Sequence, residues 1–426
     1  YYSDRFARLV ILCTLKTKGD FHMKKQQATL VDKRYLIPFV LLTSLFFLWG
    51  FAHAILDVMN KHFQELLSIT KTHSAFIQAT MYLGYFVMAI PAGLFITKYG
   101  YRRGVVFGLL LYGVGALLFI PGQYWLSFNF FLFSLFVIGC GLTFLETAAN
   151  PYVTELGPRE TAASRLNFAQ SFNGLGCICA PLLAGLLLFS EDDSIGSGNI
   201  AIPYAGMGIV VLLVAVVFSK VQLPEIKHEI EVDALGHQVG LWSHRLFVFG
   251  LIALFAYEVS EISINSFFIN YVVDQGWMSA RDASLALSFG GLSFFMVGRF
   301  LGSWIMRRVP AEKMLLSCAI GTVVTTSIVI LNAGWLSLGA LVCGYAFEAI
   351  MFPTIFALAL RGLGNHTKRA SSFLMMSPVG GVVGPLLMGY VADCTTIAWS
   401  FLVPWAGYVV VGLYAWKMVT ISKFSK

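Results

Sequence analysis

The sequence predicts an all-α integral membrane protein with twelve transmembrane helices in two parallel six-helix halves. Three observations predict this fold: a low charged fraction, long apolar blocks and an internal repeat. Of the 426 residues, 58% are hydrophobic and 12% are charged, whereas soluble domains average about 45–50% apolar and about 25% charged residues. Too little polar surface remains to cover a water-soluble globule, so a soluble protein is excluded.

Twelve stretches are long and apolar enough to cross a bilayer, which takes about 20 residues per helix. Their limits are set by clusters of polar, glycine or proline residues. The expected spans are residues 36–59, 74–97, 104–121, 127–153, 165–189, 201–221, 244–273, 283–306, 312–332, 335–360, 370–392 and 397–418. Because the number is even, both termini are expected on the same side of the membrane.

The spans divide the chain into two domains with short polar segments around them. Met23 is followed by two lysines and resembles a natural start, so residues 1–22 are interpreted as an extension that is not native. The longest internal polar stretch separates span six from span seven. The expected limits are 1–34 for the leader and cytoplasmic tail, 35–222 and 244–419 for the six-helix halves, 223–243 for a cytoplasmic linker and 420–426 for a second cytoplasmic tail.

Lysine and arginine collect in alternate loops, and the side that collects them is cytoplasmic in membrane proteins. With the N-terminus inside, the outer loops contain only Lys61, Lys71 and Arg281. We therefore expect a multi-pass protein of the plasma membrane, the inner membrane in a bacterium, with both termini in the cytoplasm. The net charge of +7 is explained by topology, so nucleic acid is excluded as a partner and the lipid bilayer is the expected surrounding.

The two halves of the sequence share motifs at nearly constant spacing. Arg102-Arg103 follows span two and Arg307-Arg308 follows span eight. Glu146 precedes Pro151 in span four, and Glu348 precedes Pro353 in span ten. Further matches are Leu156-Gly157 with Leu363-Gly364 and Ala163-Ser164 with Ala370-Ser371. A duplication into parallel six-span halves is the plan of the major facilitator superfamily, whose substrate site lies between the halves near the middle of the membrane.

Carboxylates deep in the spans call for a partner, a proton or a cavity, because each costs about 2.5–3.5 kcal/mol at a helix centre on insertion scales. Glu146 is the deepest, with Asn150 one turn further on the same face. The next helix offers Gln170 and Asn173. One acid with several amides suits a hydroxyl-rich solute, and the alternative is hydrogen bonding between packed helices. Burial favours the protonated form of Glu146, so this residue is also a candidate proton carrier.

Other charged residues in the spans are weaker candidates. Asp57 ends span one near the outer water and is either a relay for protons or an ordinary solvated helix end. Glu261 is favoured over Glu258 as a substrate ligand because it shares a helix face with Asn265. Arg299 is expected at a cytoplasmic gate, paired with a carboxylate or with carbonyls at a helix end. The basic pair Arg102 and Arg103 is assigned to the same gate.

Several segments carry a resemblance to a known family. They are YLIPFVLLTSLFFLWGFAHAILD, LETAANPYVTELGP, RLNFAQSFNGLG, FPTIFALALRGLGNHTKRASSF and VGPLLMGYVAD. From Tyr35 to Trp416 the chain resembles the fucose-galactose-glucose proton symporter family of the major facilitator superfamily, and within it the L-fucose permease branch. The resemblance implies a proton-coupled sugar importer, with Asp57 and Glu146 as proton-linked acids and Gln170 and Asn173 facing the sugar.

The sequence departs from that pattern in three places and leaves the substrate open. His53, Ala54 and Leu56 stand where the fucose permeases carry an Asn-rich segment before the acid of span one. Span seven (SEISINSFFINY) is more similar to the glucose/galactose members, and Glu348 stands where a neutral polar residue is expected. The sugar is expected to be L-fucose, with glucose, galactose or N-acetylglucosamine as alternatives, and coupling to sodium is an alternative to the proton.

Other classes of function lack their motifs. No HExxH or GxSxG motif or His/Asp cluster indicates a membrane enzyme, no segment is long enough for the output domain of a sensor, and no P-loop indicates use of ATP. The seven cysteines form no metal-binding pattern. We expect no metal and no cofactor other than the proton as coupling ion, and a protein that functions as a monomer.

Overall fold

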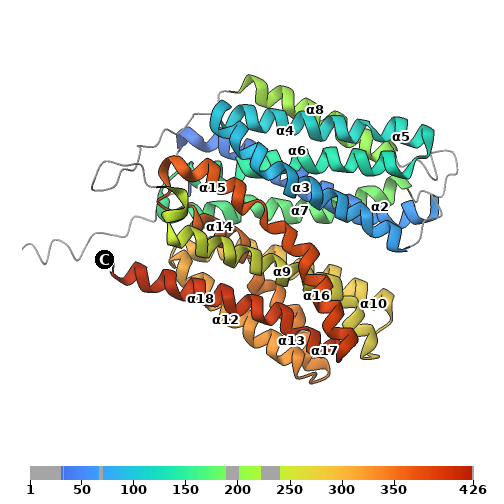
Figure 1. Cartoon of the computed structure of the whole chain (residues 1–426), viewed down its shortest axis with the longest axis vertical. Helices are drawn as coiled ribbons and strands as arrows, with labels where there is room; N and C mark the ends of the chain where they lie inside the picture. The colour runs from blue at the N-terminus through green and yellow to red at the C-terminus, as the bar shows by residue number, and fades with distance from the viewer. Residues whose placement is uncertain (1–29, 32, 67–70, 189–200, 222–239, 425–426) are drawn as a thin grey trace, which may run out of the picture.

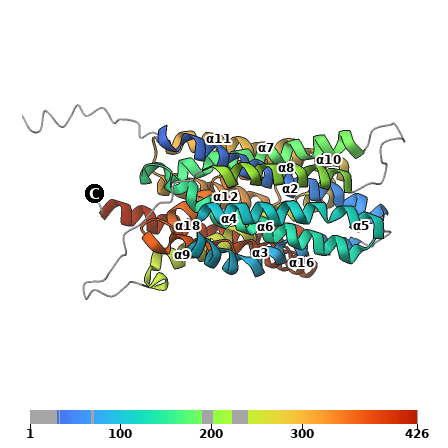
Figure 2. The same cartoon turned by 90° about the horizontal axis from the view of Figure 1, so that it is seen from above.

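The computed structural model describes residues 30–31, 33–66, 71–188, 201–221 and 240–424, with the side chains of 33, 55–66, 71–79, 180–188, 280–281, 284 and 423–424 left out of the description. All regular secondary structure in these ranges is helical. The long helices run in roughly the same direction along the molecule, which is clear when the two views are compared (Figures 1 and 2).

The first group of helices, here the N half, occupies one side of the molecule (Figure 1). Long apolar runs without internal breaks favour uninterrupted helices, and most helices here are 17 to 31 residues long. The helices of the N half are α2 (Leu36–Leu66), α3 (Lys71–Tyr99), α4 (Tyr101–Leu117), α5 (Phe119–Trp125), α6 (Phe128–Glu155), α7 (Ala162–Leu188) and α8 (Ala201–Lys220).

The second group, the C half, lies on the other side and has more interruptions (Figure 1). Its helices are α9 (Arg245–Asp274), α10 (Ala280–Leu285), the π-helical segment η5 (Ala286–Leu292), α11 (Ser293–Met306), α12 (Ala311–Ile330), α13 (Trp335–Glu348), α14 (Met351–Ala359), α15 (Thr367–Leu374), the 3-10 turn η7 (Ser377–Val379), α16 (Gly380–Cys394), α17 (Ile397–Ser400) and α18 (Leu402–Phe424). Four further 3-10 turns are η2 (Lys33–Tyr35), η3 (Arg159–Thr161), η4 (Leu241–Ser243) and η6 (Gly364–His366).

Within the described residues, eleven helical segments are long and apolar enough to cross a membrane. They fall on eleven of the twelve predicted spans. The remaining one, span five, corresponds to α7, whose side chains are described only up to residue 179. The predicted helical membrane fold is therefore confirmed, with ends that differ by several residues. Span one, for example, was expected to end at residue 59, and α2 continues to Leu66.

Five spans that were expected to be continuous are interrupted among the described residues: spans three, eight, ten, eleven and twelve. Span ten divides into α13 and α14 around residues 349–350, and span eleven divides into α15 and α16 around η7. Pro353 lies just after the first of these two breaks, and Pro378 lies within the second, in η7. Proline has no backbone N–H, so it cannot donate to the carbonyl four residues earlier, and the helix is weakened at that turn.

Small residues allow close contact where helices cross. A Cβ atom at Gly50 of α2 would lie 2.0 Å from the carbonyl oxygen of Asn173 in α7, and one at Gly384 of α16 would lie 2.3 Å from the carbonyl oxygen of Val259 in α9. Both distances are shorter than any normal contact, so a larger side chain would force these helices apart. The α2–α7 crossing thus fixes the backbone at Asn173.

The two halves meet along α7, α11 and α14 and along α3, α6 and α15. In Figure 1, α14 and α15 lie toward the end of the molecule that carries the C-terminus. This placement positions polar side chains of the two halves against each other, as described next.

Candidate functional site

Glu146 lies at the end of a chain of polar groups that links three helices of the N half. Its side chain is only 2% exposed and accepts a short hydrogen bond from the hydroxyl of Tyr85 in α3. The Tyr85 oxygen lies 3.3 Å from Nε2 of His53 in α2. When Tyr85 donates its single hydroxyl proton to Glu146, its oxygen can accept a proton from Nε2 of His53 in the tautomer that carries it. The arrangement is a continuous hydrogen-bonded path from His53 to Glu146.

Asp57, the other acid predicted to carry protons, follows His53 by one turn of α2. Its side chain is outside the described residues. Its backbone position puts it on the same helix face as His53. Its role in proton transfer remains a prediction.

The predicted amide residues divide into two groups. Gln170 donates from Nε2 to Oδ1 of Asn150 at 3.0 Å, and Asn150 is oriented with Nδ2 3.6 Å from Sδ of Met375 in the other half. Both amides are fully buried. Asn173 is half-buried, and its Oδ1 lies 3.9 Å from Sγ of Cys177. In this conformation Asn173 is therefore more available to a solute than Gln170 or Asn150.

A set of polar contacts joins the two halves, and we call it the inter-half seam. It consists of the residues Ser164, Asn167, Ser303, Thr354 and Ser371. The hydroxyl of Ser164 donates to the carbonyl of Ser303 at 2.6 Å, and the hydroxyl of Ser303 donates to the carbonyl of Ser164 at 2.8 Å. Asn167 donates from Nδ2 to the hydroxyl of Thr354 at 3.0 Å. Ser164 and Asn167, one turn apart on α7, thus both point at the other half.

Each proline of the internal repeat frees a carbonyl that a polar side chain then satisfies. Pro151 cannot donate to the carbonyl of Thr147, and the hydroxyl of Ser371 donates to it from the other half at 3.0 Å. Pro353 likewise cannot donate to the carbonyl of Ala349, which accepts from Nε of Arg299 at 3.0 Å. The repeated prolines therefore create acceptors at the surface where the halves meet.

Arg299 is buried, with 7% of its surface exposed, and it connects the two halves. Besides Ala349, its Nη1 donates to the carbonyl of Gln170 at 3.3 Å, and its guanidinium lies 4.3 Å from the centre of the Phe295 ring. Of the two pairings expected from the sequence, backbone carbonyls are the ones observed: Ala349 lies at the end of α13, whereas Gln170 lies inside α7. No ion pair joins Arg299 to a carboxylate in the described part of the chain.

The C half contributes a second group of acids near the same place. Glu258 is buried and Glu261 is half-buried in α9. Both are close enough to Arg299 to interact electrostatically, and Glu258 also interacts with Glu146 across the two halves. Asn265, one turn beyond Glu261, accepts a hydrogen bond from the hydroxyl of Tyr345 at 2.8 Å. The acids predicted in both halves thus approach a common region.

Arg102 and Arg103 lie away from the contacts between the two halves. Arg102 donates to the carbonyls of Phe218 and Ser219 at the end of α8, the first at 3.3 Å, and the guanidinium of Arg103 lies 6.0 Å from the Tyr99 ring. These contacts all stay within the N half. Their assignment to a gate remains a prediction; the contacts observed are with helix-end carbonyls for Arg102 and with an aromatic ring for Arg103.

Two residues at the site were not predicted as functional. Tyr85 gave no signal, because an aromatic residue in an apolar helix is normally a packing residue. Arg165 was counted only as a marker of topology, yet its side chain is completely buried and donates to the carbonyls of Val153 at 2.7 Å and Thr154 at 2.5 Å. An arginine shortly after a proline-containing helix end is a signal that could have suggested this capping role.

Comparison with known proteins agrees with this architecture. The family model described as Major Facilitator Superfamily matches residues 39–377. The glucose/galactose transporter of Brucella abortus is 35% identical over 391 residues, covering 90% of this chain and 94% of the relative. The L-fucose-proton symporter of Escherichia coli K12 is 33% identical over 430 residues, covering 93% and 98%. The crystal structure of the transporter FucP in the outward conformation matches with a TM-score of 0.80 at 34% identity, covering 89% of this chain and 98% of that one.

Proposed function

The chain belongs to the Major Facilitator Superfamily and is a transporter rather than an enzyme. We propose that it imports a monosaccharide by proton symport with alternating access, and that L-fucose is the first candidate substrate. The observation that carries the proposal is the buried path from His53 through Tyr85 to Glu146, next to the region where the halves meet. A deep carboxyl group with hydrogen-bonded neighbours can exchange a proton without exposing a charge to lipid.

The relatives support both the substrate class and the coupling ion. Proteins named L-fucose-proton symporter in Haemophilus influenzae and Escherichia coli are 34% and 33% identical to this chain over nearly their whole length. A second candidate substrate is glucose or galactose, because the Brucella abortus glucose/galactose transporter is 35% identical. Because these identities are similar, the transport experiment below compares several sugars instead of L-fucose alone.

The proposed transport step begins with the protonation of Glu146. Asp57 receives the proton from the outer side, and His53 and Tyr85 pass it to Glu146 through their hydrogen bonds. The neutral acid then offers both a donor and an acceptor to a sugar hydroxyl. Asn173 contributes from α7, and Glu261 and Asn265 contribute from the facing α9, while Gln170 and Asn150 become available when their mutual hydrogen bond opens.

The inter-half seam sets which side is closed. The seam lies toward the end of the molecule that carries the C-terminus (Figure 1). By the positive-inside rule we assign this end, with both termini, to the cytoplasmic side. The described conformation is then closed toward the cytoplasm. We propose that the protein acts as a monomer in the plasma membrane and that the loaded site opens inward when the seam contacts of Ser164, Ser303 and Ser371 separate. Deprotonation of Glu146 on the alkaline side then weakens sugar binding and favours release.

The experiment is uptake into proteoliposomes of labelled L-fucose, D-glucose, D-galactose and N-acetylglucosamine. A pH gradient, alkaline inside, is imposed with sodium present or replaced by choline. We expect L-fucose to accumulate with the gradient and to equilibrate without accumulating when an ionophore collapses it. If no sugar accumulates in response to the pH gradient, proton–sugar symport is wrong; if only glucose or galactose accumulates, the second candidate replaces L-fucose.

A further inference from the structure

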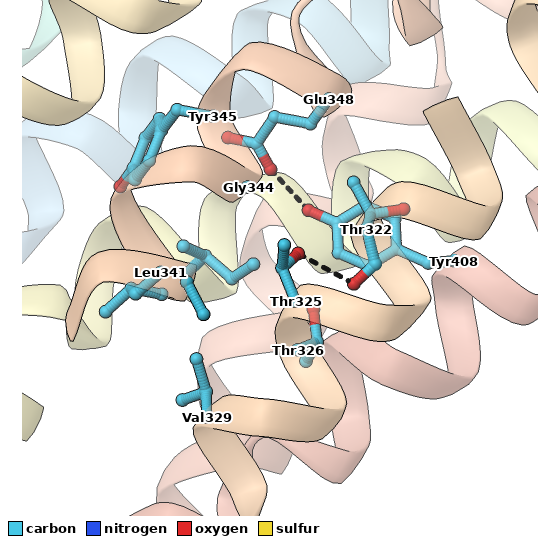
Figure 3. A pocket seen from close by; sticks show the side chains of 11 residues that line it. Thr322, Thr325, Thr326, Val329, Leu341, Gly344, Tyr345, Glu348 and Tyr408 are labelled. Carbon is cyan, nitrogen blue, oxygen red and sulfur yellow. Dashed lines mark hydrogen bonds between the residues drawn. The ribbon is translucent and has the colours of Figure 1, made fainter. Parts of the chain in front are cut away.

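A small polar cavity lies inside the C half, among α9, α12, α13 and α18 (Figure 3). Its polar wall comes from the side chains of Thr322, Thr325 and Thr326 of α12, Tyr345 and Glu348 of α13 and Tyr408 of α18. It leaves about 10 Å³ for the centre of a water-sized ligand, which is room for about one water molecule or one ion of similar size.

Glu348 has one carboxyl oxygen without a protein partner in this cavity. The side chain is 1% exposed; Oε2 accepts a short hydrogen bond from the hydroxyl of Tyr408, and Oε1 has no hydrogen-bond partner. Leaving a buried polar atom without a partner destabilises the folded state, and more so if the atom is charged. Something that fits the cavity is therefore needed to satisfy Oε1.

Two of the three threonines of the cavity offer lone pairs rather than protons. The hydroxyl of Thr322 donates to the carbonyl of Ala319 at 3.0 Å, and the hydroxyl of Thr325 donates to the carbonyl of Thr322 at 3.1 Å. A hydroxyl has one proton and two lone pairs, so both oxygens remain free only to accept. Oxygen acceptors around one carboxylate form a set that a hard cation prefers.

The charges of the C half also lack a positive partner here. Glu348 interacts electrostatically with Glu261 and Arg299, but Arg299 donates its hydrogen bonds to the carbonyls of Ala349 and Gln170. Three carboxyl groups, those of Glu258, Glu261 and Glu348, thus share one arginine in the described part of this region. An ionised carboxylate in such a place needs a cation of its own.

We propose that this cavity is a binding site for one monovalent cation of sodium's size, held by Oε1 of Glu348 and the hydroxyl oxygens of α12. One carboxylate balances one positive charge, and no group of three His, Cys, Asp or Glu side chains that could hold a divalent metal occurs among the described residues. The inference goes beyond the proposed function, because the site lies in the other half from Glu146 and takes an ion other than the proton.

The site is connected to the predicted sugar region through one side chain. Tyr345 forms part of the cavity wall, and its hydroxyl donates to Oδ1 of Asn265. A cation that draws Glu348 toward α12 changes the packing around Tyr345 and so the orientation of Asn265. Occupancy of the cavity would therefore bias the conformation of the helix that faces the N half.

The test is equilibrium binding of radioactive sodium to the purified full-length protein in detergent, without sugar and with choline as the replacement cation. We expect saturable binding of one sodium ion per chain that Glu348→Gln abolishes. Thr326→Val removes a lining hydroxyl while keeping the shape and the carboxylate, and it should weaken binding about tenfold, as expected for about 1.4 kcal/mol. Glu312→Gln is the matched control, because Glu312 is also buried in α12 but pairs with Arg361 at 3.5 Å; its sodium binding should equal that of the wild type.

Each result decides the proposal. No saturable sodium binding by the wild type would mean that water alone fills the cavity, and unchanged binding in both Glu348→Gln and Thr326→Val would place sodium elsewhere; either result overturns the inference. If Glu348→Gln does not fold, Thr326→Val and Thr325→Val decide it in the same assay. Because the assay contains no sugar and no pH gradient, its failure leaves proton-driven uptake untouched, and failure of uptake leaves the sodium result untouched.

Discussion

Replacing Arg299 with lysine should shift the equilibrium between the closed and open seam without a matching loss of sugar affinity. Arg299 donates to Ala349 within its own half and to Gln170 in the opposite half. Only the second hydrogen bond is broken when the halves separate. Lysine keeps the charge but lacks the planar fork that reaches two carbonyls at once.

The size of the effect follows from that single contact. A hydrogen bond from a charged donor contributes about 1.5–3 kcal/mol, so losing it from the closed state alone changes the ratio of closed to open molecules by about 10-fold to 150-fold. Arg299→Ala should give the same shift and in addition leave the carbonyl of Ala349 without a partner, so its thermal stability should also fall.

Pulsed electron resonance between spin labels can measure the shift directly. Residues 159 and 365 are exposed on opposite halves at the seam end, and the exposed Cys343 and Cys394 are replaced by serine in the background. We expect a longer distance population to grow in Arg299→Lys, while sugar affinity from tryptophan quenching stays within a few-fold of the wild type. An unchanged distance distribution, or an affinity that falls in step with transport, would refute the assignment of Arg299 to the gate.

Three further changes test other parts of the site. Glu146→Gln should bind and exchange sugar but fail to accumulate it, since the amide imitates the protonated acid and cannot release a proton; accumulation at the wild-type level under a pH gradient would show that Glu146 is not the obligatory carrier. Asn173→Ala should weaken sugar binding by about 1–3 kcal/mol if a hydrogen bond to a buried hydroxyl is lost, and an unchanged affinity in calorimetry would move the site toward Glu261. Arg165→Ala should lower the melting temperature in detergent because two helix-end carbonyls lose a charged donor, while Arg103→Ala, an exposed control, should not; equal melting temperatures for the two variants would contradict the capping role.

Sequence patterns predicted the membrane helices well because the cost of burying polar backbone and side chains in lipid leaves few alternatives. The breaks in spans ten and eleven were missed, although Pro353 and Pro378 mark them. Hydropathy averages over a whole span, whereas a break depends on a single missing N–H group. The sequence therefore located the spans more reliably than their interruptions.

The candidate site was only partly accessible to the same reasoning. Glu146 stood out because a carboxylate in an apolar helix is costly, but Tyr85, which hydrogen-bonds to it, looks like any other packed aromatic residue. The partners of Arg299 could not be derived either, because backbone carbonyls are present at every position and only the tertiary structure brings particular ones within reach. Asp57 lies outside the described side chains.

The carbonyl that Pro151 frees in α6 ties the opening of the pathway to its hydration. While the seam is closed, the hydroxyl of Ser371 satisfies the oxygen of Thr147; when α15 moves away, only solvent can take its place. Ala349, by contrast, keeps its arginine from the same half. Parting of the halves and entry of water are therefore one event on the N-half side, and conditions that lower water activity, such as concentrated osmolyte in the cytoplasmic-side buffer, should hold the transporter in its inward-closed form.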